Sequence, residues 1–229
     1  TPDIRFRGTS KAGQYGDSIR ELDYHVGEIM NVLDELGLAE NTILIYTSDN
    51  GGQLKDVAKA GIGLNLSDDS FDVAAKARTP KITARKMGHK TNLDLREGKA
   101  SPYEGGFRVP FIIRWPKQID GGKISNRFIN SADFLATFAD LFDKKLPAKA
   151  GEDSFSFIDE FTSKHVREKR QNATLLSSKA HSFVEGDWKL VDFNYSRLNP
   201  LQKVELYNLR KDPTESKDLA LSHPDKLES

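Results

Sequence analysis

Apolar residues recur at steps of three and four along residues 17–37, which predicts an amphipathic helix. The apolar positions are Ile19, Leu22, Val26, Ile29, Met30, Leu33 and Leu36. Ser18 and Glu21 have the spacing of a capping box, and Gly37 suits the end of the helix. A second amphipathic helix is expected over residues 131–142, with Ser131 as its N-terminal cap.

Residues 41–48 and 109–116 are expected to form two further buried strands, and the run "TILIY" in the first is apolar throughout rather than alternating between apolar and polar positions. Such a run is typical of a strand that is buried on both faces of a parallel sheet. A helix followed closely by such a strand indicates an α/β unit. We therefore expect residues 1–145 to form part of an α/β domain.

The pattern changes after residue 145, where short apolar segments are separated by turn residues. The segments "ATLLSS", "HSFVEGDWKLVDF" and "KVELYNL" predict a small antiparallel sheet, with Glu185-Gly186-Asp187 as a hairpin loop. We therefore expect residues 146–229 to form a small antiparallel-sheet subdomain. Residues 53–90 are polar and read as a loop insert, and a loop of this length is usually functional or mobile.

Composition narrows the possible functions of the 229-residue chain. Lys+Arg and Asp+Glu both number 34, so a global electrostatic attraction to nucleic acid or to an anionic membrane is not expected. No run approaches 18 apolar residues, so no membrane span is predicted. The absence of cysteine excludes disulfides, thiolate metal sites and a cysteine nucleophile on this chain.

The segment "YTSDNGG" (46–52) allows two interpretations. Asn-Gly between apolar strands is a strong hairpin signal, but the following "GGQLKDVAKAG" is a poor returning strand. The alternative is a strand that ends in Asp49 and Asn50 at a ligand site, because such sites lie beyond the carboxyl ends of strands in open α/β sheets. Both side chains offer oxygen, which Ca²⁺ and Mg²⁺ prefer.

Lys99 lies in the compact segment "LREGKASPYEGGFRVPFIIRWP" (95–116). A loop lysine is usually a solvated charge, whereas tight backbone turns could also hold its ammonium group against an anion. The spacing does not separate these two interpretations. His89 precedes Lys99 by ten residues in a loop and could reach a substrate.

Four segments in this order resemble the type I, arylsulfatase-like sulfatases of the alkaline phosphatase superfamily: "YGDSIRELDYHVGEIMNVLDELGLAENTILIYTSDNGG", "TNLDLREGKASPYEGGFRVPFIIRWP", "DWKLVDF" and "ELYNLRKDPTES". The resemblance implies the C-terminal part of an alkaline-phosphatase-like α/β sandwich with a small C-terminal antiparallel sheet. It implies that Asp49 and Asn50 bind one divalent cation, Ca²⁺ or Mg²⁺, and that Lys99 contacts the sulfate. Glu104 and Arg108 match the family segment as an ion pair or loop brace.

The family's formylglycine nucleophile is made in a Cys/Ser-x-Pro-x-Arg motif, which this sequence lacks. The resemblance therefore implies the C-terminal portion of a sulfatase, inactive alone, with an N-terminal half as partner and a sulfated small molecule or carbohydrate as substrate. By the same resemblance the enzyme is periplasmic, secreted or lysosomal. A phosphodiesterase or phosphonate hydrolase of the same superfamily and a non-catalytic remnant or binding domain are the alternatives.

Overall fold

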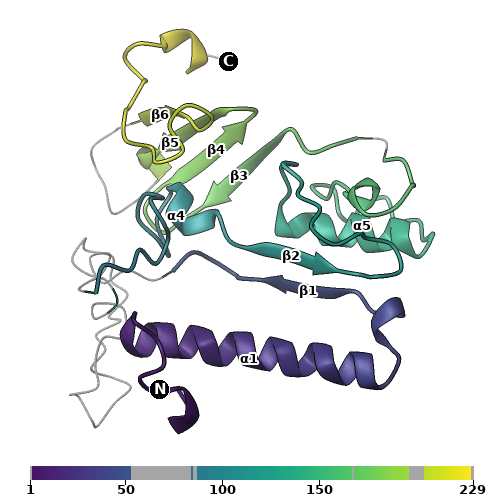
Figure 1. Cartoon of the computed structure of the whole chain (residues 1–229). Coiled ribbons are helices and arrows are strands. Elements are labelled where there is room, and N and C mark those ends of the chain that lie inside the picture. The colour runs from purple at the N-terminus through teal and green to yellow at the C-terminus, as the bar shows by residue number, and fades with distance from the viewer. Residues whose placement is uncertain (1, 53–83, 85–86, 167, 196–203, 228–229) are drawn as a thin grey trace.

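The computed structural model describes residues 2–52, 84, 87–166, 168–195 and 204–227. Its helices and strands in chain order are α1 (Gly13–Glu35), β1 (Leu44–Thr47), α4 (Glu104–Phe107), β2 (Phe111–Arg114), α5 (Phe134–Leu141), β3 (Asn172–Leu176), β4 (His181–Glu185), β5 (Trp188–Asp192) and β6 (Val204–Asn208) (Figure 1). Most of the insert predicted over residues 53–90 lies outside these described residues.

Helix α1 begins earlier than its sequence pattern predicted. Its first residue is Gly13 and no side chain caps its N-terminus, so the predicted capping box of Ser18 and Glu21 is wrong. The carboxylate of Asp17 instead accepts hydrogen bonds from the amides of Gly8 and Ser10 at 2.8 Å each. The helix therefore starts against the preceding loop.

The predicted C-terminal end of α1 is confirmed. Gly37 has a φ of +64°, the left-handed conformation that glycine adopts without cost. The amide of Leu38 donates to the carbonyl of Leu33 at 2.8 Å, and the Gly37 amide donates to the carbonyl of Asp34 at 3.1 Å. These two bonds form a Schellman motif, which ends the helix.

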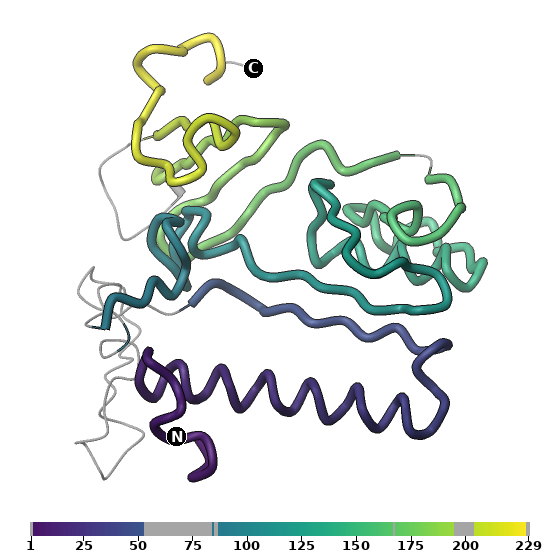
Figure 2. The backbone as a smooth tube through the Cα atoms, viewed as in Figure 1, coloured from purple at the N-terminus to yellow at the C-terminus, as the bar shows by residue number. Residues whose placement is uncertain are grey.

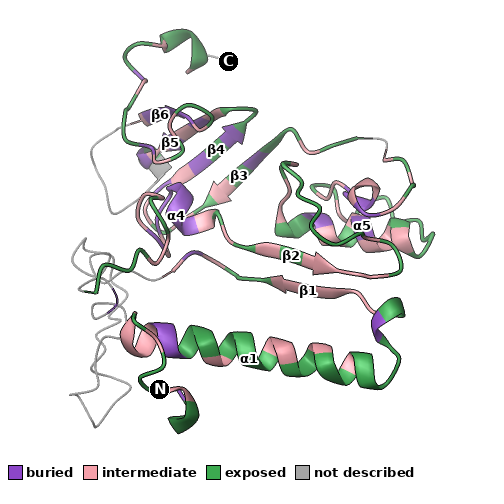
Figure 3. Ribbon diagram, viewed as in Figure 1, coloured by how far each residue is buried: buried purple, intermediate pink, exposed green. Residues whose placement is uncertain are grey.

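Beyond its first turns, helix α1 consists of exposed and half-buried residues (Figure 3), and these include its apolar positions. Leu22 is 42% exposed, Ile29 is 51% exposed and Leu36 is 65% exposed. The helix runs alongside β1 (Figure 2), and an ion pair between Asp34 and Arg114 (3.2 Å) joins its C-terminal end to β2. Much of the apolar face that the sequence predicted therefore lacks a covering layer among the described residues.

Of the helices that the structure describes, none combines the length and apolarity needed to cross a membrane.

Strands β1 and β2 pair antiparallel, with Leu44 opposite Arg114 and Thr47 opposite Phe111. The prediction of parallel pairing from their uniform apolarity is therefore wrong for this pair. A uniformly apolar strand indicates that both of its faces are covered. It does not determine whether the neighbouring strand runs parallel or antiparallel. Within the described residues β1 is half-buried along most of its length.

One face of the β1–β2 ribbon is covered by an apolar cluster. Phe157, Ile158 and Phe161 form its buried centre and pack against residues of β2 and α5. Asn130 caps the helical segment that leads into α5 and forms a capping box with Asp133. The helix predicted over residues 131–142 is thus confirmed, whereas Ser131 as its cap is wrong by one residue.

The small antiparallel sheet is confirmed, with strand order β3-β4-β5-β6. Gly186, at a φ of +55°, lies in the predicted hairpin loop between β4 and β5. Tyr103, which precedes α4, is inserted into the apolar core of this sheet beside Val191 and Tyr207. The sheet therefore packs against the segment that carries Lys99, and the division of the chain near residue 145 stays a prediction.

Candidate functional site

The predicted metal ligands lie in a turn that directly follows β1. We call residues 49–52 the Asp-Asn turn. The Oδ1 atom of Asp49 accepts from the amide of Asn50 at 2.9 Å, and the Ser48 hydroxyl donates to the carbonyl of Asn50 at 3.0 Å. The turn does not lead into a hairpin, because the neighbour of β1 is β2, some sixty residues later. A strand that ends before Asp49 and Asn50 is therefore confirmed, whereas a ligand site at this strand end stays a prediction.

The structure brings Lys99 to this turn. We call residues 96–106 the lysine loop. The amide of Lys99 donates to the carbonyl of Gly52 at 3.1 Å, and the amide of Gly51 donates to the carbonyl of Gly106 at 2.9 Å. The Asn92 side chain links the two segments further, because it accepts from the Gly52 amide at 2.8 Å. Segments almost fifty residues apart thus share one hydrogen-bonded unit.

Backbone packing within this unit is very close. A Cβ atom on Gly51 would lie 1.7 Å from the carbonyl oxygen of Gly105, so no other residue fits at position 51 without movement. Glu97 and Ala100, which flank Lys99, have φ values of +55° and +67°. Non-glycine residues hold this conformation where the surroundings enforce it, often at functional sites.

The chemistry of the turn fits a hard cation. Asp49 is exposed and offers carboxylate oxygens. The side-chain nitrogen of Asn50 donates to the carbonyl of Gly51 at 3.0 Å, which leaves its Oδ1 atom for a ligand. In the described part of the chain, no three His, Cys, Asp or Glu side chains gather closely enough to hold a metal ion. Asp49 and Asn50 by themselves would supply only part of the about six to eight oxygens that Ca²⁺ takes, and their role as metal ligands stays a prediction.

The other side of the lysine loop is anchored to the C-terminal sheet by buried charges. Lys189 on β5 is fully buried, donates to Oε1 of Glu104 at 3.0 Å and lies 2.8 Å from Oε1 of Glu215. The second oxygen of Glu215 accepts from the amide of Glu104 at 2.6 Å. The predicted ion pair between Glu104 and Arg108 is present at 4.0 Å. The contact of Glu104 with Lys189 is shorter, at 3.0 Å.

A second group of contacts surrounds Arg96 at the start of the lysine loop. Its guanidinium group lies 3.7 Å from the ring centroid of Tyr103 and donates to the hydroxyl of Tyr207 at 2.8 Å. Both tyrosines donate to Oε2 of Glu205, at 2.8 and 2.7 Å. Burial and the adjacent carboxylate raise the pKa of Tyr103 and of Tyr207, so both phenols remain donors at neutral pH.

Asp212 organises the turn that carries Glu215. Its carboxylate accepts from the amides of Ser216 and Lys217 at 2.8 and 2.9 Å and from the hydroxyl of Thr214 at 2.9 Å. Desolvation favours the neutral acid, but these donors outweigh it and lower the pKa of Asp212. Glu215 itself has a φ of +53° within this turn.

The stability that this turn contributes is expected to depend on pH. Because the folded-state pKa of Asp212 lies below its usual value of 3.8, the stabilisation is present above that value and is lost as the pH falls through the folded-state pKa. The wild type should therefore unfold at a higher temperature than Asp212→Asn at pH 5–7, and the gap should close below about pH 4. A gap that stays constant down to pH 3 would contradict this assignment.

His89 stands apart from the hydrogen-bonded unit. Its ring lies 5.5 Å, between centroids, from Tyr15 of α1, its backbone amide donates to the carbonyl of Ala84 at 2.9 Å, and the residue is exposed. Among the described contacts none joins His89 to Asp49, Asn50 or Lys99. Its substrate-binding role stays a prediction.

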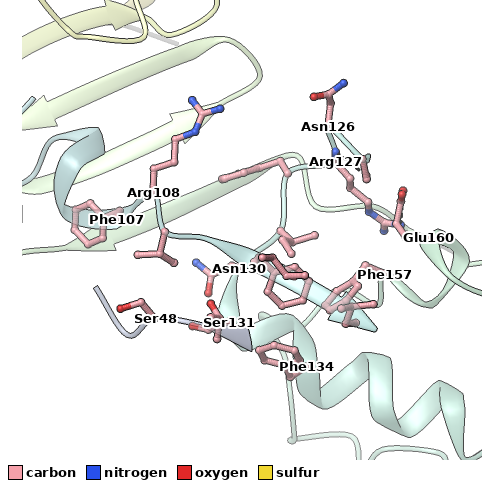
Figure 4. Close-up of a pocket in the computed structure, with 18 of the residues that line it drawn as sticks. Ser48, Phe107, Arg108, Asn126, Arg127, Asn130, Ser131, Phe134, Phe157 and Glu160 are labelled. Atoms are coloured by element: carbon pink, nitrogen blue, oxygen red, sulfur yellow. Dashed lines mark hydrogen bonds and ion pairs between the residues drawn. The ribbon is translucent and has the colours of Figure 1, made fainter. Parts of the chain in front are cut away.

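A cavity of about 930 Å³ lies beside the candidate site and shares Asp49 and Glu104 with it. Figure 4 shows part of its lining, with Ser48 and Arg108 among the labelled residues. Its lining is drawn mainly from β2 and from the segments around Phe128, Phe134 and Phe157. Asn50 and Lys99 are not part of this lining. Because neither Asn50 nor Lys99 lines this cavity, we take the hydrogen-bonded unit, and not the cavity, as the candidate site.

Sequence reasoning assigned no role to Asn92, Lys189 or Glu215. Asn92 is one polar residue among many in its segment and gives no signal. Lys189 does give a sequence signal, because side chains of β5 alternate between its two faces and Lys189 lies on the buried face together with Val191. A lysine at such a position needs a buried anionic partner, and two carboxylates occupy that place here.

Two protein-family models match the chain. A model described as Sulfatase matches residues 3–144, and a model described as N-sulphoglucosamine sulphohydrolase, C-terminal, matches residues 98–226. An N-acetylgalactosamine-6-O-sulfatase of Bacteroides thetaiotaomicron is 33% identical over 98% of this chain and 42% of its own length. The human steryl-sulfatase is 34% identical over 62% of this chain and 20% of its own length.

Solved structures agree with these matches. One, described as concerning glycosaminoglycan metabolism by Bacteroides thetaiotaomicron, has a TM-score of 0.76 at 31% identity, over 98% of this chain and 44% of that chain. A sulfatase from Pseudoalteromonas has a TM-score of 0.66 at 23% identity, over 95% of this chain and 40% of that chain, and shows the fold alone. This chain thus spans less than half the length of these relatives. The expected fold class is confirmed, and the chain belongs to the sulfatase family.

Proposed function

We propose that the complete protein hydrolyses sulfate esters, with Asp49 and Asn50 on a divalent cation and Lys99 on the sulfate group. The observation that carries this proposal is the hydrogen-bonded unit of the Asp-Asn turn and the lysine loop. Its two backbone bonds hold the Asp-Asn turn, which carries the proposed metal ligands, directly against the backbone of the loop that carries Lys99. One sulfate group could then contact both.

The chemistry of the reaction requires such a pair. Hydrolysis of a sulfate ester moves negative charge onto the leaving oxygen and around the sulfur. Asp49 and Asn50 would hold a Ca²⁺ or Mg²⁺ ion, which would supply positive charge beside the sulfate group when bound. Lys99 adds an ammonium group. Because the hydrogen bond to Gly52 fixes the backbone of Lys99, little reorganisation of the loop is needed when the charge develops.

A sulfated carbohydrate is the substrate class that we propose. The relative named an N-acetylgalactosamine-6-O-sulfatase matches 98% of this chain, whereas the steryl-sulfatase matches 62%. Similarity to the carbohydrate enzyme thus extends through the C-terminal sheet. A sulfated small molecule of another kind is the alternative that a substrate panel would reveal.

We further propose that a formylglycine nucleophile and the remaining metal ligands belong to an N-terminal half of the enzyme. Two observations support this proposal. The relatives are more than twice as long as this chain, and the apolar face of α1 is largely exposed. An extracytoplasmic location follows from the family resemblance and is also a proposal.

Lys99→Ala in the complete protein tests the proposed function. The variant is expected to lose on the order of 100-fold in kcat/KM for a 6-O-sulfated N-acetylgalactosamine, as enzymes do when they lose one donor to a developing anion. Its metal content should remain that of the wild type, because Asp49 and Asn50 are unchanged. Steady-state kinetics and elemental analysis measure the two quantities.

Lys144→Ala serves as the matched control, because Lys144 is an exposed lysine beyond α5 and should show wild-type kinetics. Unchanged activity in Lys99→Ala would identify Lys99 as a solvated surface charge. A complete protein that turns over phosphodiesters or phosphonates instead of sulfate esters would favour the superfamily alternative. Absence of any turnover would favour a non-catalytic binding domain.

A further inference from the structure

The lysine loop contacts the Asp-Asn turn on one side and the C-terminal sheet on the other. On the turn side it is held by two backbone hydrogen bonds, from Lys99 to Gly52 and from Gly51 to Gly106. On the sheet side it is held by side chains of β4, β5 and β6 and of the turn after β6. The C-terminal sheet therefore has the means to fix the position of Lys99.

The contact between Glu215 and Glu104 is central to this attachment. The Glu104 amide is the first of helix α4, and Glu215 accepts its hydrogen bond at 2.6 Å. The side chain of Glu215 is fully buried, as is that of Lys189, which lies between the two glutamates. Burial raises the pKa of Glu215, while Lys189 and the Glu104 amide favour its charged form and oppose that shift.

Further bonds from the sheet fix the loop on both sides of Lys99. The hydroxyl of Ser182 donates to the carbonyl of Pro102 at 2.7 Å, and that of Ser178 donates to the carbonyl of Ala100 at 3.2 Å. Lys179 lies 3.0 Å from the carboxylate of Glu97. The left-handed residues Glu97 and Ala100 are therefore both tied to the C-terminal sheet, which explains how their conformation is maintained.

We infer that Glu215, together with Lys189, is a positioning residue that fixes the lysine loop and thereby sets Lys99 at the Asp-Asn turn. This inference rests on the proposed role of Lys99. A buried ion network is by itself weak evidence for a stabilising role, because apolar residues of similar volume often stabilise a fold as well or better. A network of defined geometry instead provides one fixed orientation, which a sulfate-binding ammonium group requires.

Two substitutions of Glu215 in the complete protein test the inference. Glu215→Ala removes both the carboxylate and the acceptor for the Glu104 amide, whereas Glu215→Gln keeps an acceptor oxygen and leaves Lys189 paired with Glu104. The alanine variant is expected to lose roughly 10- to 100-fold in kcat/KM, as is typical when a residue that orients a site is removed. The glutamine variant should fold and retain an intermediate value. Glu40→Ala, which makes the same change at an exposed glutamate, should leave kcat/KM unchanged.

A double-mutant cycle separates positioning from a purely structural role. If Glu215 acts through Lys99, Glu215→Ala should lower kcat/KM in the wild type and have little further effect in a Lys99→Ala background. An equal fold-loss in both backgrounds would overturn the inference. Wild-type kinetics for a folded Glu215→Ala protein would overturn it as well.

Amide hydrogen exchange gives a readout that does not depend on activity. In Glu215→Ala, the amides of Glu104, Gly106 and Lys99 should exchange at least about 10-fold faster, while those of α5 stay protected. Unchanged exchange of the lysine loop would overturn the inference. If the complete protein hydrolysed no sulfate ester, the proposed function would fail, and faster exchange confined to the loop would still support the attachment.

Discussion

Replacement of Asp49 by alanine is expected to remove the metal and the activity of the complete enzyme together. Asp49 is the charged ligand that we propose in the Asp-Asn turn, and its carboxylate also accepts a hydrogen bond from the amide of Asn50 at 2.9 Å. A metal ion contributes several kcal/mol of charge stabilisation in the transition state. Because each 1.4 kcal/mol is a factor of ten, a loss of roughly 1000-fold in kcat is expected.

Elemental analysis and kinetics on the same preparation check this expectation. Asp120→Ala is the matched control, because Asp120 is also an exposed aspartate that follows a strand, in this case β2. Excess Ca²⁺ should restore part of the activity of Asp49→Ala if the remaining ligands still bind the ion weakly. Full metal content with unchanged activity would refute Asp49 as a ligand.

The sequence located the elements of the candidate site well, because their signals are local. The apolar run before Asp49 predicted a strand end, and the poor returning strand argued against a hairpin. Gly37 and Gly186 predicted a helix end and a hairpin loop, since both positions need a left-handed backbone. Each of these features depends on a few neighbouring residues.

The pairing of β1 with β2 and the attachment of the lysine loop to the C-terminal sheet depend on residues far apart in the sequence. Local sequence patterns were insufficient to predict either. Uniform apolarity of β1 and β2 indicated coverage, but their antiparallel pairing is set by how the chain returns some sixty residues later. The role of Lys189 needed the positions of Glu104 and Glu215, 85 residues before it and 26 after it. A buried lysine in an alternating strand could still have been flagged from the sequence alone.

The candidate site therefore depends on a close approach of two backbones, and Gly51→Ala is expected to disrupt it severely. The new Cβ atom would lie 1.7 Å from the carbonyl oxygen of Gly105, a backbone atom that cannot rotate away. Gly105 is itself held closely against the lysine loop, because its amide donates to the carbonyl of Arg96 at 3.0 Å and a Cβ added to it would lie 2.2 Å from the carbonyl oxygen of Glu97. Overpacking of this kind costs about 3 kcal/mol of unfolding free energy.

The two segments should respond by moving apart, which breaks the bond from Gly51 to Gly106 and separates Asp49 from Lys99. A shift of about 1 Å at a catalytic group can cost roughly 100-fold in rate, so Gly51→Ala should lose both thermal stability and kcat/KM. Gly27→Ala is the control, because Gly27 lies within α1 with no atom near its added Cβ. That change should stabilise the protein by about 0.5–1 kcal/mol. Wild-type stability and kinetics in Gly51→Ala would show that the turn and the loop do not depend on their close contact.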